Sequence, residues 1–181
     1  MNDVTHLGLQ DIPMMANIPN LVYLAPTTKE EYLAMLDWSI EQKEHPIAIK
    51  LPGGDVISDG KEVTKDFSIL NKYEMTRKAS KVAILGLGTF YGLGNDVADL
   101  MKEKAGIDAT VINPYYITGL DEEMLEDLKK DHSVVITLED GILDGGFGEK
   151  IARFYGDSNM KVLNFGLKKE FLDRYDVTEV L

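Results

Sequence analysis

The sequence predicts an α/β fold built around a mostly parallel β-sheet. Short apolar segments alternate with longer segments whose apolar residues recur at helical spacing. The short segments are continuously apolar, which is typical of strands that are buried on both faces. Glycine and proline mark their boundaries, and the alternation of strand and helix favours a sheet that helices cover on both sides.

The first predicted strands lie before residue 57 and flank one helix. The apolar run Leu21–Leu24 predicts the first strand, and "PIAIKL" at residues 46–51 predicts the second. Residues 26–45 predict the helix, because Thr27 or Thr28 can cap its start and two glutamates follow in its first turn. These few elements are too little to enclose a core of their own.

The pattern then pauses and restarts. Residues 57–80 are polar, contain glycine and show weak periodicity, so they are predicted to connect two units. From residue 81 onward, strands are predicted over 81–88, 109–114, 133–140 and 161–166, and helices over 95–106, 121–131, 145–156 and 168–176. Residues 81–181 are therefore predicted to form a complete α/β domain.

Composition excludes several classes of function. The net charge of −12 argues against binding to a nucleic-acid backbone, which requires clustered lysine and arginine. No apolar run approaches the roughly 20 residues of a membrane span, and no secretory signal is recognisable at the N-terminus. There is no cysteine, so neither disulfides nor thiolate metal sites are expected. These features fit a cytoplasmic protein.

Two glycine loops precede predicted helices. Gly86 and Gly88 match the first two glycines of a dinucleotide-binding loop, but Tyr91 stands where the third glycine is required, so a tight turn is the preferred interpretation. The second loop, "EDGILDGGFGEK" at residues 139–150, could offer backbone N–H groups to an anion. Its acidic residues would repel that anion, so close packing of the loop is preferred.

One carboxylate pair stands at a position suited to ligands. Glu139 and Asp140 end a predicted buried strand, and open α/β sheets bind ligands at the carboxyl ends of their strands. The pairs Glu30–Glu31 and Glu122–Glu123 fall at helix starts and are predicted to be solvated caps. The histidines share no metal-ligand spacing, so no metal site is predicted; exposed loop positions are expected for His45 and His132.

A series of short motifs runs in order along nearly the whole chain. It includes "THLG" from residue 5, "IPN" from residue 18, "APT" from residue 25, "AIKLPGG" from residue 48, "VAILGLGT" from residue 82 and "VITLEDGILDGGFGEKI" from residue 135. In this order the motifs resemble those of the transketolase-type thiamine-diphosphate enzymes, most closely the 1-deoxy-D-xylulose-5-phosphate synthases.

The resemblance implies a three-layer domain like the transketolase C-terminal domain at residues 81–181. It implies the end of a pyrimidine-binding domain at residues 1–56 and a linker at residues 57–80. The parent enzyme is expected to use thiamine diphosphate and magnesium to convert pyruvate and glyceraldehyde 3-phosphate into deoxyxylulose phosphate, a precursor of isoprenoids and thiamine. In such an enzyme the cofactor supplies the carbanion chemistry and the protein orients it.

The resemblance also implies roles for individual residues. His6 matches the family's active-site histidine, which contacts cofactor and sugar substrate. Asn2 or Asp3 falls near the aspartate of the family's D-G-P-T-H motif, although the D-G-P itself is not kept. Lys50 aligns with a second basic position. The arginine that binds phosphate in the family is replaced by Gly53, which cannot offer a planar fork to a phosphorylated acceptor. His6, Asp3 and Lys50 are the predicted substrate contacts, and His6 is the predicted catalytic residue.

The family's diphosphate-and-magnesium motif, G-D-G followed by Asn, does not occur in the sequence. The chain alone is therefore expected to bind no cofactor and to be inactive, forming one rim of an active site. It is expected to pair as a homodimer or with the missing N-terminal part, and to meet a small sugar, phosphorylated or free. Without the rest of the pyrimidine-binding domain, strand edges and an apolar helix face (Tyr32, Met35, Leu36) would be exposed to solvent. Self-association is therefore also expected.

Two other interpretations stay open at this point. The chain could be a subunit of a transketolase-like paralogue or a non-catalytic interaction module. A free-standing dinucleotide-fold protein that binds a small molecule is a third interpretation, and the imperfect glycine spacing disfavours it.

Overall fold

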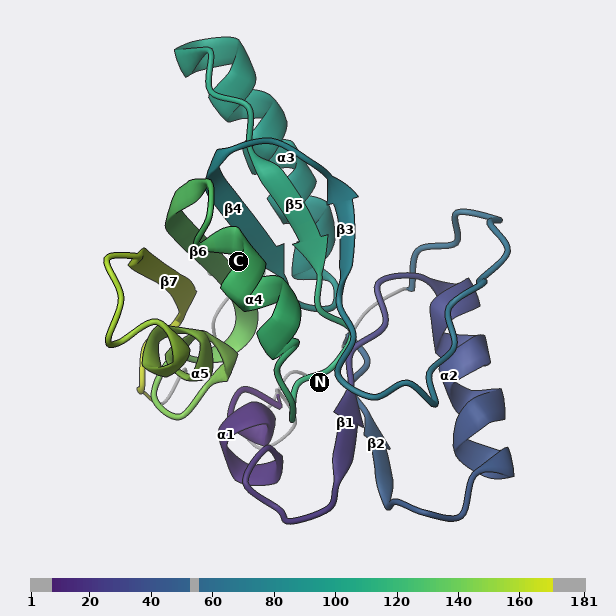
Figure 1. Cartoon of the computed structure of the whole chain (residues 1–181). Coiled ribbons are helices and arrows are strands. Elements are labelled where there is room, and N and C mark those ends of the chain that lie inside the picture. Colours follow the sequence, from purple (N-terminus) through teal and green to yellow (C-terminus); the bar gives the residue numbers. More distant parts are fainter. Residues whose placement is uncertain (1–7, 53–55, 171–181) are drawn as a thin grey trace.

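The computed structural model describes residues 8–52 and 56–170, which form two sheets of different size (Figure 1). The larger sheet has the strand order β3-β5-β4-β6-β7, and the smaller consists of β1 and β2. The strands are β1 (Val22–Leu24), β2 (Ile47–Ile49), β3 (Glu74–Arg77), β4 (Lys81–Gly86), β5 (Thr110–Asn113), β6 (His132–Ile142) and β7 (Lys161–Leu167). The helices are α1 (Asp11–Met15), α2 (Lys29–Glu41), α3 (Phe90–Ala105), α4 (Glu122–Leu128) and α5 (Phe147–Phe154).

The larger sheet is mostly parallel and is covered on both faces. β4 pairs in parallel with β5 and β6, and β6 with β7, whereas β3 at the edge runs antiparallel to β5. Alternate residues of β4 face opposite sides, so Ala83 and Leu85 pack with α4 and α5 while Ile84 packs with α3. The predicted α/β fold with a mostly parallel sheet is confirmed.

The smaller sheet is parallel and packs against α2. Met35 of α2 is fully buried in a cluster with Phe67 and Tyr116, which come from outside this unit. The prediction of an uncovered apolar face was therefore wrong for Met35. The large apolar side chains of α2 that remain exposed are Leu33, at 45%, and Ile40, at 71%.

A segment of the larger unit closes the outer edge of β1. The N–H of Ala25 donates to the carbonyl of Tyr115 at 2.8 Å, and the N–H of Ile117 donates to the carbonyl of Tyr23 at 2.7 Å. The N–H of Tyr23 donates to the hydroxyl of Thr118 at 3.1 Å. β1 therefore lies between β2 and the segment 115–118, and backbone hydrogen bonds join the two units.

The stretch predicted to be a linker, residues 57–80, contains the edge strand β3 and a buried anchor. Phe67 is 3% exposed, and its carbonyl accepts the Tyr116 hydroxyl at 3.0 Å. Sequence reasoning missed β3 because its residues, "EMTR", are polar and mostly exposed, as an edge strand with one covered face allows. The five-stranded sheet thus begins at Glu74, before the predicted boundary at residue 81.

Other boundaries also differ from the prediction. α3 begins at Phe90 rather than at residue 95, because Gly88, with a φ of 55°, lets the chain turn directly from β4 into the helix. The short helix α1 was not predicted. Of the helix predicted over 168–176, residues 168–170 are not helical and the rest lies outside the described residues.

Asp121 connects the segment 57–80, which was predicted to be a linker, to α4. Its carboxylate accepts the N–H of Tyr73 at 3.0 Å and the N–H of Met124 at 3.2 Å, and Lys72 lies 3.3 Å away. Asp121 is 4% exposed, so these hydrogen bonds form away from water.

Replacing Asp121 with alanine should lower the free energy of unfolding by about 2–3 kcal/mol, because it removes a helix cap and leaves the buried N–H of Tyr73 without an acceptor. Glu122→Ala, one residue further and exposed, is the control and should change stability by less than about 0.5 kcal/mol. Urea unfolding monitored by circular dichroism measures both. Equal effects of the two substitutions would contradict the anchoring role of Asp121.

Candidate functional site

The carboxyl ends of the strands in both sheets face one another (Figure 1). Ala25 directly follows β1, and a Cβ added to Gly88, in the loop after β4, would lie 3.2 Å from the Ala25 Cβ. Lys50, which follows β2, reaches Asp140 in β6. Because ligands of α/β proteins bind at the carboxyl ends of strands, this junction is the candidate site.

The centre of the junction is an ion pair between the two units. The Lys50 Nζ lies 3.6 Å from the Asp140 Oδ2, and the two side chains are 9% and 23% exposed. Burial raises the pKa of Asp140, and the nearby Lys50 ammonium opposes that rise. The ion pair brings together two predicted features, the basic position at Lys50 and the strand-end carboxylate at Asp140.

Further groups surround this ion pair. A Cβ on Gly8 would lie 3.8 Å from the Lys50 Nζ and 2.6 Å from an Asp11 carboxylate oxygen, so the first described residues pass beside the pair. Tyr23 is 2% exposed, and burial together with Asp11 and Asp140 raises the pKa of its phenol, which stays neutral. The cluster combines an ammonium, two carboxylates and a phenol, groups that can donate to or accept from a polar ligand.

His6, Asp3 and Gly53 lie outside the described residues, so their predicted roles stay predictions. Lys50 lies in the junction as its predicted role requires, but Asp140 already neutralises its charge. A direct contact between Lys50 and a substrate also stays a prediction.

Glu139 and Asp140, predicted as a pair, point to different partners. Glu139 is fully buried, and its two oxygens accept the N–H groups of Phe147 and Gly148 at 2.9 and 2.7 Å, which caps the start of α5. Burial raises the pKa of Glu139 to about 7, and the two hydrogen bonds oppose this rise without cancelling it. Glu139 therefore holds the glycine loop, and Asp140 alone faces the junction.

The first glycine loop was predicted to be a tight turn and the second to be closely packed, and the structure agrees with both predictions. A Cβ on Gly148 would lie 2.5 Å from the Thr137 hydroxyl, and one on Gly146 would lie 2.6 Å from Glu139, so close packing of the second loop is confirmed. In the first loop a Cβ on Gly86 would lie 2.6 Å from the Phe90 carbonyl, and the Tyr91 N–H bonds the Gly88 carbonyl at 3.0 Å. That loop is the tight turn that was predicted.

Two predictions of solvent exposure need correction. The His132 side chain is 3% exposed, and its Nε2 lies 2.8 Å from the Thr110 hydroxyl, because His132 opens β6 opposite Lys81 of β4 instead of lying in a turn. Glu31 is partly buried and accepts the N–H and the hydroxyl of Thr27 at 2.6 and 2.8 Å, while its own N–H donates to Thr28. The Thr28-x-x-Glu31 spacing of a capping box could have indicated this.

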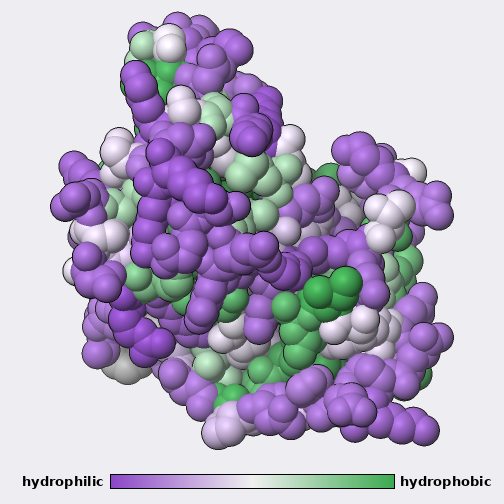
Figure 2. All heavy atoms as spheres, in the orientation of Figure 1, coloured by the Kyte–Doolittle hydropathy of each residue, from purple (hydrophilic) through white to green (hydrophobic). Residues whose placement is uncertain are grey.

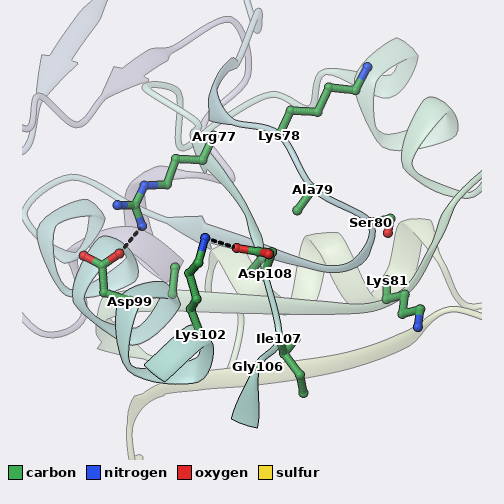
Figure 3. Close-up of a pocket in the computed structure, with 12 residues that line it drawn as sticks. Arg77, Lys78, Ala79, Ser80, Lys81, Asp99, Lys102, Gly106, Ile107 and Asp108 are labelled. Atoms are coloured by element: carbon green, nitrogen blue, oxygen red, sulfur yellow. Dashed lines mark hydrogen bonds and ion pairs between the residues drawn. The ribbon is translucent and has the colours of Figure 1, made fainter. Parts of the chain in front are cut away.

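A second cavity lies at the opposite, amino-terminal edge of the larger sheet (Figure 3). It is basic in composition, but Arg77 pairs with Asp99 and Lys102 pairs with Asp108, each at 2.8 Å. The C-terminal end of α3 lies here at Gly106, and its dipole disfavours anions. This cavity is therefore a poor anion site.

Neither a metal centre nor a membrane span is evident in the part of the chain that the structure describes. Within residues 8–52 and 56–170, no three histidine or carboxylate side chains come close enough together to hold a metal ion. No helix in these ranges is long and apolar enough to cross a bilayer.

Comparisons with known proteins identify relatives of this chain. Residues 71–181 match the family model described as transketolase, C-terminal domain. The chain is 34% identical over 178 residues to a 1-deoxy-D-xylulose-5-phosphate synthase of Clostridium tetani, covering 97% of the chain and 28% of that enzyme. It is 37% identical over 173 residues to the synthase of Francisella philomiragia, covering 93% of the chain and 26% of that enzyme.

A solved structure is also similar to the chain. It is described as a split gene transketolase, inactive beta4 tetramer, and aligns with a TM-score of 0.79 and 21% identity over 94% of this chain and 56% of that one. This likeness concerns the fold. The chain spans about 28% of the length of the curated synthases that it matches.

The buried Glu139 makes a pH dependence testable. The pKa of Glu139 rises from 4.5 to about 7 on folding, so the folded state binds the proton more tightly than the unfolded state does. The stability that this proton binding contributes is present below pH 4.5 and is lost as the pH rises from 4.5 through 7. Wild type should therefore lose about 2–3 kcal/mol relative to Glu139→Gln between pH 5 and pH 8. Urea unfolding at both pH values measures this difference, with Asp144→Asn as the exposed control. Identical pH dependence in wild type and Glu139→Gln would contradict the assignment.

Proposed function

We propose, on the premise that this chain belongs to the transketolase C-terminal domain family, that it is the C-terminal part of a thiamine-diphosphate-dependent two-carbon transferase. The proposed reaction is the synthesis of 1-deoxy-D-xylulose 5-phosphate from pyruvate and glyceraldehyde 3-phosphate. The observation that carries the proposal is the 34% identity to a 1-deoxy-D-xylulose-5-phosphate synthase, which extends over 97% of the chain and includes the residues before the family match.

The described residues do not fit the cofactor by themselves. They bring no three carboxylate or histidine side chains together for a magnesium ion, and the junction between the units carries more acidic than basic groups. A diphosphate group would meet repulsion there rather than a cradle. We therefore propose that the rest of the enzyme holds the cofactor and that this chain forms one rim of the site.

The rim is proposed to begin at His6 and to continue along the Lys50–Asp140 pair. Gly8, two residues after His6, lies beside Lys50, which supports a common location for the two predicted substrate contacts. In this arrangement the imidazole of His6 donates to or accepts from the substrate near neutral pH. Lys50, held by Asp140, keeps the carboxyl end of β2 next to β6.

The remainder of the pyrimidine-binding domain is proposed to attach at the open edge of β2. The segment 115–118 closes the outer edge of β1, and no described strand pairs with the free edge of β2. Since pairing groups alternate along a strand, the backbone groups of Ile47 and Ile49 face that free edge. Figure 2 shows hydrophobic side chains gathered across the lower centre of this face, in front of the smaller sheet, and such a surface favours a cover from another part of the enzyme or a second copy.

A non-catalytic interaction module is the second candidate. It is favoured by Gly53, which stands where the family has its phosphate-binding arginine. Under either function the cytoplasm is the expected location, and the partners are a second copy or the preceding part of the enzyme. Synthesis of deoxyxylulose phosphate by the complete enzyme would favour the transferase, and its absence would favour the interaction module.

The isolated chain is expected to bind no thiamine diphosphate, because the cofactor motif does not occur in it. Isothermal titration with micromolar cofactor and millimolar magnesium should give no saturable heat. Magnesium-dependent binding with a stoichiometry near one would contradict the proposal that the rest of the enzyme holds the cofactor.

His6→Ala should lower kcat by about a hundredfold in the complete enzyme, since a positioned acid or base contributes roughly 10²–10⁴-fold. The assay joins this chain to the upstream part of a related synthase and follows pyruvate consumption. His45→Ala is the control, because His45 pairs with Asn20 away from the junction. Unchanged turnover in His6→Ala would show that the assigned role is wrong.

Gly53→Arg should improve use of a phosphorylated acceptor in the same joined enzyme. A restored guanidinium fork is worth about 1.5–3 kcal/mol, which corresponds to a ten- to hundredfold lower KM. Gly54→Arg, which adds the same charge one residue later, is the control. Equal behaviour of the two variants would mean that position 53 does not face the phosphate.

A further inference from the structure

The ladder between β6 and β7 is irregular near the carboxyl end of β6. Leu138 pairs with Phe165 and Ile142 pairs with Leu167, so β6 spends more residues than β7 between these two pairs. The residues between them, 139–141, therefore form a bulge, which bends the strand and can re-aim its side chains. Bulges are common beside active sites, and this one lies at the junction between the two units.

Each residue of the bulge holds a different part of the molecule. Glu139 caps α5, and Asp140 pairs with Lys50 at 3.6 Å. Gly141 lies against α1, because a Cβ added to it would lie 3.1 Å from the Ile12 Cδ1, which is closer than side chains normally approach. The missing side chain of Gly141 therefore allows α1 to pack closely on the end of β6.

The backbone next to Gly141 holds the same segment. The N–H of Ile142 donates to the carbonyl of Leu9 at 3.0 Å, and Ile12 is fully buried in the core of the larger unit. Further along the loop, Gly145 has a φ of 73°, and a Cβ on it would lie 3.1 Å from the Pro13 Cβ. Contacts on both sides of Leu9 and Ile12 thus fix the segment before and within α1 on the bulge.

The place of this segment decides what lies beside Lys50. The N–H of Asp11 donates to the carbonyl of Gly8 at 3.2 Å, so the chain turns at Gly8 directly into α1. A Cβ on Gly8 would lie 3.8 Å from the Lys50 Nζ. A displacement of α1 on the bulge would therefore also move Gly8, which is two residues from the predicted catalytic residue His6.

We propose that Gly141 is a positioning residue for the reaction: because it has no side chain, α1 lies close against the bulge, and this sets the place of the segment that leads to His6. The proposal rests on the proposed transferase function, since it assigns Gly141 a role in that reaction. Gly141 acts through Ile12 and Leu9 and not by contact with the substrate.

The experiment uses a compensating pair of substitutions in the complete enzyme, which joins this chain to the upstream part of a related synthase. Gly141→Ala adds a methyl group that meets the Ile12 Cδ1. It should lower kcat about fivefold, because a 1 Å misplacement can cost about a hundredfold and a few tenths of an ångström correspondingly less. Ile12→Val removes the same Cδ1, so the double variant should recover kcat to within about twofold of wild type.

Gly92→Ala is the matched control for this pair. It adds the same methyl group, but no described atom lies within 4 Å of a Cβ at this position. Its kcat should stay within about twofold of wild type, as for a surface substitution. All variants are assayed well below the lowest midpoint of thermal unfolding, so that a loss of kcat does not reflect a loss of folded enzyme.

A second measurement separates this proposal from the transferase function. In the isolated full chain, the NMR signals of the His6 imidazole should shift in Gly141→Ala, return toward wild type in the double variant with Ile12→Val, and stay in place in Gly92→Ala. A joined wild-type enzyme without activity would contradict the transferase function. The imidazole signals would then decide the role of Gly141 by themselves.

Four outcomes overturn the proposal: an unchanged kcat in Gly141→Ala, a loss that Ile12→Val does not restore, an equal loss in Gly92→Ala, or His6 signals that Gly141→Ala leaves in place. If thermal unfolding shows that Gly141→Ala is not folded, Ile12→Val alone replaces it. That substitution loosens the same contact from the other side and should lower kcat about threefold, and an unchanged kcat would then overturn the proposal.

Discussion

The pairing of β1 with the segment Tyr115–Thr118 is the interaction on which the rest of the structure depends. Three hydrogen bonds of 2.7–3.1 Å join the small sheet to the loop that follows β5. Lys150 of α5 fixes the same segment from the other side, donating to the carbonyls of Ile117 and Thr118 at 2.8 and 3.4 Å. Burial lowers the pKa of Lys150 to about 8. A two-stranded sheet is marginal in isolation, and this pairing gives it a third neighbour.

This constraint also creates both polar clusters at the junction. Because β1 is held against the end of β5, the carboxyl ends of the two sheets face one another. On one side Lys50 meets Asp140 at 3.6 Å. On the other side Glu31 at the start of α2 comes within reach of Asn113 at the end of β5. The junction thus carries two chemically different polar clusters, one around Lys50 and Asp140 and one around Glu31 and Asn113.

Sequence reasoning predicted the elements whose patterns are local. The strands and helices of the larger unit follow from continuous apolar runs and helical spacing, and the motif order pointed to the right family. β3 was missed because a short polar edge strand carries no periodic signal. The burial of His132 was missed because it depends on Thr110, which is distant in sequence and lies on the strand beyond β4 in the folded sheet.

The junction was predictable only in part. Lys50 and Asp140 were each singled out, one from a motif and the other from its place at a strand end, but no sequence pattern indicated that they contact each other. The opposite orientations of Glu139 and Asp140 follow from the pleat of β6 and from the position of α5, which are known only once the chain is folded. Long-range pairings of this kind decide the site, and a single sequence does not contain them.

Native-state hydrogen exchange tests the central role of the junction most directly. The amide hydrogens of Ala25 and Ile117, which cross between the units, should exchange as slowly as those in the centre of β4, because the two units then open together. The amide of Lys50, which bonds only within the small sheet, serves as the comparison. Exchange of Ala25 and Ile117 at the rate of exposed loop amides, with β4 still protected, would contradict the account.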